Sequence, residues 1–117
     1  PYSRPAHYTA AVAERLASGK IVGWFQGRME FGPRSLGARS ILASPIPAEM
    51  QQRLNEIKDR EDFRPVAPAV LEEKAHLWFE ACTDSPFMLF VHDVVGARAD
   101  RVPALRNVDG TARVQTV

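Results

Sequence analysis

The segment IVGWFQGRMEFGPRSLGARSILA, residues 21–43, places a glycine-rich stretch between two short apolar runs. Ile21–Gln26 is apolar, β-branched and aromatic, which is typical of a short buried strand. Ser40–Ala43 is a second candidate strand. Three glycines and a proline lie within Gly27–Gly37, a density at which no regular element persists. The segment therefore predicts two strands with a shaped loop between them.

This loop and the residues after it carry three arginines, Arg28, Arg34 and Arg39. Glycines let the backbone approach a ligand and turn its N–H groups inward. Arginines supply charge and paired donors for phosphate oxygens, and Glu30 is placed to orient one of them. A surface turn with solvated arginines fits the same pattern equally well, so both interpretations stay open.

The rest of the chain alternates short helices and strands, which indicates an α/β (α+β) fold. Helical spacing predicts helices over Tyr8–Ser18, which Gly19 ends, and over Ala48–Ile57, with Met50, Leu54 and Ile57 as its buried stripe. The remaining expectations are an extended lead-in (residues 1–7), an edge or bulged strand (Phe63–Leu71), a short helix (Glu72–Phe79), the strongest strand (Phe87–Val91), a polar connection (Gly96–Asn107) and a last strand (Thr111–Val117).

A second charged stretch, KDREDFRP, covers Lys58–Pro65 just past a predicted helix end. Basic residues at that position complement the helix dipole. By pattern alone, a solvated helix cap with weak surface ion pairs is the better interpretation.

A third stretch, DGTARVQT, covers Asp109–Thr116, where an Asp-Gly turn leads into a strand. Alternation places Thr111, Arg113 and Gln115 on one face. That polar row fits a solvated face or a binding face, and the pattern does not decide between them.

Bulk properties exclude several classes. The chain has 117 residues, which predicts one domain, and its net charge of +1 argues against a nucleic-acid-binding module, which is usually distinctly basic. The single cysteine, Cys82, allows no disulfide within the chain and is expected to be a small buried apolar residue. The apolar runs are too short to cross a membrane, and no signal peptide is evident, so a cytoplasmic location is expected.

Common motifs for metal or nucleotide binding are missing from the sequence. The three histidines lack metal-ligand spacing, so no metal site is expected. Neither a P-loop nor the dinucleotide-binding glycine motif occurs.

Taken together, four stretches resemble the carbamoyltransferase family that includes the nodulation protein NodU and the antibiotic O-carbamoyltransferases. They are GWFQGRMEFGPRSLGARSIL (residues 23–42), KDREDFRPVAP (58–68), SPFM (85–88) and VDGTARVQTV (108–117). Their order and spacing match the family, and the resemblance covers nearly the whole chain from about residue 10. Asn107 departs from the histidine usual before Val-Asp-Gly.

The resemblance implies a two-part enzyme. A YrdC-like half activates carbamoyl phosphate with ATP to give carbamoyl adenylate, with Mg²⁺ accompanying the ATP. An ASKHA-type half then transfers the carbamoyl group to a hydroxyl. Residues 1–117 match the N-terminal portion of the YrdC-like half, in which a mixed twisted sheet is flanked by short helices. The family's sequence continues beyond residue 117, so the isolated chain is expected to be inactive.

The same resemblance assigns roles to individual residues. Lys58 and Arg60 match a Lys-x-Arg pair for the anionic substrate, and Arg64 and Arg113 match further catalytic arginines. Residues expected to bind substrate or ATP are Arg28, Arg34, Arg39, Ser40, Asp109, Thr111 and Gln115. We expect the basic members of both groups to converge on one concave surface. The alternatives are an RNA-binding YrdC-like module and a fragment without activity of its own.

Overall fold

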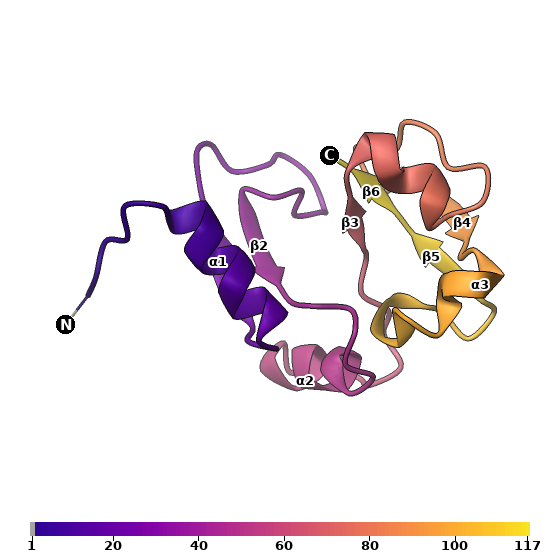
Figure 1. Ribbon diagram of the computed structural model, residues 1–117, viewed down its shortest axis with the longest axis horizontal. Helices are drawn as coiled ribbons and strands as arrows, with labels where there is room; N and C mark the ends of the chain where they lie inside the picture. The colour runs from indigo at the N-terminus through magenta and orange to yellow at the C-terminus, as the bar shows by residue number, and fades with distance from the viewer. Residues whose placement is uncertain (1) are drawn as a thin grey trace.

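The computed structural model describes residues 2–117 and is elongated, with extents of 44 × 28 × 27 Å (Figure 1). Helix α1 (Tyr8–Ala17) and the hairpin of β1 (Val22–Phe25) and β2 (Arg39–Leu42) form the N-terminal part. Helix α2 (Met50–Ile57) lies at the base and leads into the C-terminal part (Figure 1). Pro1, part of the predicted lead-in, lies outside the described residues.

The N-terminal part is held by the hairpin. β1 and β2 pair antiparallel, with Val22 opposite Leu42 and Phe25 opposite Arg39. Helix α1 contains no buried residue and contacts the hairpin through Tyr8, whose ring stacks on Trp24 with centroids 6.2 Å apart. Both strands and the helix were predicted within about two residues of their observed bounds.

The C-terminal part contains the remaining strands and three short helices. The strands are β3 (Ala69–Val70), β4 (Val91–Asp93), β5 (Thr111–Arg113) and β6 (Gln115–Thr116), and the helices are η1 (Glu72–Leu77), α3 (Gly96–Ala99) and η2 (Pro103–Leu105). Their main core consists of Phe79, Val94, Ala99, Val102, Leu105, Ala112 and Val114. Every described helix falls short of the length and apolar content that a membrane span requires.

The mixed α+β class is confirmed. β3 pairs parallel with β6, and β4 pairs antiparallel with β5. The described strands form three separate two-stranded ladders, and Val114, completely buried, interrupts the predicted last strand between β5 and β6. This arrangement matters for the site because it carries Arg113 and Gln115 on consecutive short strands.

The prediction of a strand over Phe87–Val91 is wrong. The strand begins at Val91, whereas Phe87, Leu89 and Phe90 are exposed. Met88 has a φ of 54°, a left-handed conformation that interrupts extended backbone.

Three other segments differ from their predictions. The connection Gly96–Asn107 contains α3 and η2, and it buries Val102 and Leu105 between charged neighbours. The strand predicted over Phe63–Leu71 shrinks to β3, because its prolines cannot donate to a ladder. The predicted helix over Glu72–Phe79 is observed as the shorter 3₁₀ helix η1.

Helix α2 packs on η2 through Met50 and Leu54, which contact Ala104. Ile57, predicted as the third member of the buried stripe, is 58% exposed. The short helix η2 covers only the first part of α2, so Ile57, the last residue of α2, extends past the contact.

This packing predicts unequal costs for two substitutions on α2. Replacing Met50 by alanine should lower the free energy of unfolding by about 2–5 kcal/mol, because the side chain is only 1% exposed and its removal leaves a cavity. Ile57→Ala should change the same quantity by less than about 0.5 kcal/mol. Urea unfolding of both variants measures the difference, and equal losses would contradict the packing described here.

Candidate functional site

The loop between β1 and β2 is closed by a carboxylate. Oε1 of Glu30 accepts hydrogen bonds from the backbone N–H groups of Leu36 at 2.7 Å and Ala38 at 2.6 Å. These bonds, with the backbone N–H of Glu30 itself, lower the pKa of this carboxyl to about 2. Glu30 therefore holds the backbone, and the expectation that it orients an arginine directly is not supported.

Arg39 and Ser40 also hold this loop. The Arg39 guanidinium lies 3.3 Å from the centroid of the Phe25 ring and donates to the carbonyl oxygens of Gln26, Gly27 and Ala38. Ser40 Oγ accepts from the backbone N–H of Gly37 at 3.0 Å and hydrogen-bonds Ser35 Oγ at 2.9 Å. Both side chains were predicted to bind ligand, which stays a prediction, and in the structure their hydrogen bonds stabilise the loop.

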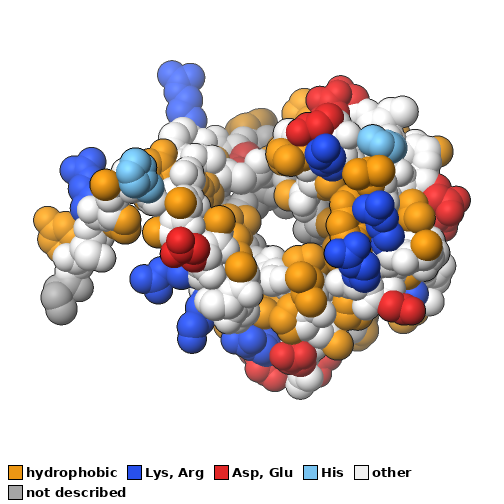
Figure 2. All heavy atoms as spheres, in the orientation of Figure 1, with side chains coloured by type: hydrophobic (Ala, Val, Ile, Leu, Met, Phe, Trp, Pro, Cys, Tyr) orange, Lys and Arg blue, Asp and Glu red, His pale blue; other side chains and the backbone are white. Residues whose placement is uncertain are grey.

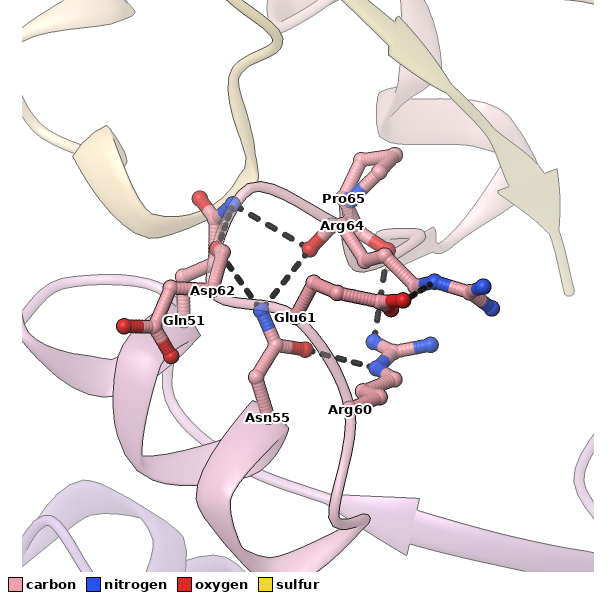
Figure 3. A network of polar contacts seen from close by, with 7 residues as sticks. All are labelled: Gln51, Asn55, Arg60, Glu61, Asp62, Arg64 and Pro65. Atoms are coloured by element: carbon pink, nitrogen blue, oxygen red, sulfur yellow. Dashed lines mark hydrogen bonds and ion pairs between the residues drawn. The ribbon is translucent and has the colours of Figure 1, made fainter.

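A buried asparagine shapes the second basic stretch (Figure 3). Asn55, 0% exposed on α2, donates through Nδ2 to the carbonyl oxygens of Asp62 at 2.9 Å and Arg64 at 3.0 Å. Its Oδ1 accepts from Arg60 Nε at 2.7 Å. Asn55 thus ties the turn to the helix and orients Arg60.

Asn55 was not among the residues predicted from the sequence. Its signal in the sequence is weak, because a polar residue beside Leu54 on a short helix is more often solvated. Only the return of the chain over the helix end encloses it.

Arg64 behaves as the pattern alone suggested. Its Nε lies 2.7 Å from Glu61 Oε2, and both side chains are more than half exposed. The backbone N–H of Glu61 lowers the pKa of that carboxyl, and the charge of Arg64 lowers it further. Such an exposed pair contributes little to stability.

The third stretch begins with a turn closed by side chains. Asp109 Oδ1 accepts from Thr111 N–H at 3.0 Å and from Thr111 Oγ1 at 2.8 Å, which lowers the pKa of Asp109. Asn107 Nδ2 donates to Thr111 Oγ1 at 3.0 Å. Asp109 and Thr111, both predicted to bind substrate, therefore shape the start of β5, and Asn107 contributes to the same turn.

Gln115 joins the third stretch to the first. Its Nε2 donates to the Leu36 carbonyl oxygen at 3.0 Å, a contact between residues 79 positions apart. The Gln115 residue is almost completely buried. The glycine-rich loop is thereby attached to β6.

Arg113 lies where the three stretches meet. Burial lowers its pKa, and the charges of Arg34 and then Arg60 lower it further. Arg113 Nε is buried and has no hydrogen-bond partner among residues 2–117. Loss of water and the charge of Arg60 likewise lower the pKa of Lys58. We call Arg34, Lys58, Arg60 and Arg113 the basic cluster.

Two shallow pockets adjoin the basic cluster. One, of about 170 Å³, is lined by Pro65, Val66, Ala67, Val91, Asn107 and Arg113. The other, of about 150 Å³, is lined by Phe31, Gly32, Pro33, Arg34, Leu36, Phe87 and Leu89. Each combines an apolar wall with one arginine of the cluster.

The charges of Arg34 and Arg60 act on Arg113, and that of Arg60 acts on Lys58, which indicates that these four of the seven basic residues lie near one another. The Arg64 guanidinium lies close to that of Arg60 as well (Figure 3). Arg39 is engaged by the loop backbone, and Arg64 is paired with Glu61. Arg28 is exposed and forms no hydrogen bond or ion pair within the described part of the chain. The region supplies cations and no group of three His, Cys, Asp or Glu side chains able to hold a metal ion among residues 2–117.

Comparison with known proteins shows close relatives over most of the chain. The family model described as Carbamoyltransferase C-terminus matches residues 13–117. Nodulation protein NolO of Bradyrhizobium diazoefficiens is 50% identical over 112 residues, which cover 92% of this chain and 20% of the relative. Nodulation protein U of Sinorhizobium fredii is 52% identical over 106 residues, which cover 91% of this chain and 19% of the relative.

The chain spans about a fifth of the length of these curated relatives. The matched region includes all three basic stretches and both strands of the hairpin. Because the family model and the relatives each match about nine tenths of its residues, the chain belongs to the carbamoyltransferase C-terminus family, which confirms the resemblance to NodU-type carbamoyltransferases.

Proposed function

We propose that this chain is part of a longer, ATP-dependent O-carbamoyltransferase, in which its basic cluster binds carbamoyl phosphate and ATP. The observation that carries the proposal is Arg113, which is half-buried and acted on by the charges of Arg34 and Arg60, and whose buried Nε has no hydrogen-bond partner among residues 2–117. Uncompensated like charges are costly to hold together. A site that carries such a cost is suited to an anionic ligand, whose oxygens would pair with the arginines.

The proposed chemistry requires charge neutralisation more than a protein nucleophile. Water hydrolyses carbamoyl phosphate to carbamate and phosphate, and a carbamate oxygen then displaces pyrophosphate from the α-phosphorus of ATP. The products are carbamoyl adenylate and pyrophosphate. Arg34, Arg60 and Arg113 would bind the phosphate oxygens and stabilise the charge that develops on them.

Mg²⁺ fits this proposal only as a partner of ATP. The basic cluster presents positively charged groups that repel a metal ion, and the carboxylates of Glu30, Glu61 and Asp109 in the three stretches are engaged by backbone groups or by Arg64. Phosphate oxygens of the nucleotide would therefore hold the ion, whose charge would assist departure of pyrophosphate.

Nucleic-acid binding is the weaker alternative. Proteins of that class usually present a basic stripe that follows the phosphate backbone. On the face drawn in Figure 2, Lys and Arg side chains stand singly or in small groups among apolar and acidic ones. Arg34, Arg60 and Arg113 of the basic cluster are half-buried, whereas Lys58 is exposed, and partly enclosed arginines suit a small anion better than a polyanion.

The adenylate mechanism predicts exchange of labelled pyrophosphate into ATP only when carbamoyl phosphate is present. The longer carbamoyltransferase should catalyse this exchange, whereas the isolated chain should not. Formation of ADP in place of AMP, or exchange without carbamoyl phosphate, would contradict the mechanism.

The charge crowding predicts opposite effects of Arg113→Ala on activity and on stability. Turnover should fall about tenfold to several hundredfold, because a contact between charged groups contributes about 1.5–3 kcal/mol and more in the transition state. The melting temperature without ligand should stay unchanged or rise, because one member of a repelling cluster is removed. Lys58→Ala should follow the same pattern.

The control for these two variants is Arg15→Ala, which removes an exposed arginine from α1. Thermal melts with and without carbamoyl phosphate plus ATP should show stronger ligand stabilisation of the wild type than of the cluster variants. Variants that melt far lower and keep full turnover would mean that these residues are structural.

A further inference from the structure

We propose that Glu30 is a positioning residue of the carbamoyl phosphate site: it closes the glycine-rich loop so that Leu36 reaches Gln115 and Arg34 is held beside Arg113. This inference rests on the proposed function of the basic cluster. It assigns to Glu30 a role that acts through the backbone, without contact to the substrate.

The first step is the geometry of the closure. A single oxygen, Oε1 of Glu30, accepts from two N–H groups at 2.7 and 2.6 Å. Gly37 lies between the two donors with a φ of 113°, a conformation that side chains rarely adopt. The left-handed glycine lets both flanking N–H groups turn toward the same carboxylate oxygen.

The second step links this closure to β6. The Leu36 N–H group is held by Glu30, and the Leu36 carbonyl oxygen accepts from Gln115 Nε2 at 3.0 Å. Both backbone groups of Leu36 are therefore hydrogen-bonded: its N–H within the loop, and its carbonyl oxygen to the C-terminal part. Arg34 precedes Leu36 by two positions, and Arg113 precedes Gln115 by two positions. The Gln115–Leu36 bond therefore joins the two backbone segments that carry these arginines, and the charge of Arg34 acts on Arg113.

The third step concerns the charge of Glu30. A free carboxylate near Arg34 would pair with it and compete with an anionic substrate. The two backbone hydrogen bonds engage this carboxylate and lower its pKa to about 2, so it stays ionised even in weakly acidic solution. Glu30 can thus bind the backbone strongly and leave Arg34 available.

Hydrogen exchange in the intact protein tests whether Glu30 holds the loop. In Glu30→Ala, amides of residues 27–40 should exchange about ten- to a hundredfold faster, as expected when hydrogen bonds to a charged acceptor are lost. Peptides from α2 and β4 should keep their exchange rates. Glu30→Gln, which retains an acceptor oxygen, should give an intermediate loss, and the exposed Glu14→Gln on α1 should give none.

A double-mutant cycle tests whether the loop acts through Arg34. Glu30→Ala should raise the KM for carbamoyl phosphate about ten- to a hundredfold, because small displacements of a positioning group have effects of this size. In an Arg34→Ala background the same change should have little further effect. A merely structural role for Glu30 would give additive effects on KM, so non-additivity distinguishes the two roles.

Three results would overturn parts of this account, and they can be told apart. Unchanged loop exchange in Glu30→Ala would show that the carboxylate does not hold the loop. Additive effects on KM would show that Glu30 does not act through Arg34. An Arg34→Ala variant with unaltered KM would overturn the proposed function of Arg34 and its placement by Glu30, while the exchange data would still decide whether Glu30 closes the loop.

Discussion

The half-buried guanidinium of Arg113, placed beside two other arginines, is the constraint around which the basic cluster is organised. Burial and like charge both lower its pKa, and its Nε has no partner among residues 2–117. A charge in this situation destabilises the native state unless a ligand compensates it. The surrounding fold must therefore supply the stability that this position lacks.

That stability comes largely from side chains that bond to the backbone. Glu30 closes one loop, Asn55 fastens a second to α2, and Asp109 closes a third. Each of these contacts satisfies backbone groups in segments that have little regular structure. The irregular segments are consequently held in place by side-chain hydrogen bonds, and they carry Arg34 and Arg60 of the basic cluster.

The same principle separates two kinds of arginine in this chain. Arg39 and Arg64 are engaged by carbonyl oxygens or by a carboxylate, and so they contribute to local structure. The charge of Arg34 acts on the half-buried Arg113, and neither side chain forms an ion pair within the described part of the chain. Arg60 belongs to both kinds, since Asn55 orients its Nε while its charge acts on Arg113 and Lys58. Family motifs list all of these arginines alike, and only their partners distinguish them.

The sequence by itself determined the family, the mixed α+β class, the hairpin flanking a shaped loop and the three basic stretches, because these depend on local composition and on motifs with fixed spacing. It misplaced β4, since an apolar run such as Phe87–Val91 predicts a strand unless a left-handed residue like Met88 interrupts it. It also missed Asn55 and the burial of Val102 and Leu105, because burial depends on what packs above a residue. Tertiary structure alone decided that Gln115 would bond to Leu36, 79 positions away, which attaches the loop that carries Arg34 to the strand that follows Arg113. A contact across such a distance follows from the packing of whole segments, and no local pattern in the chain encodes it.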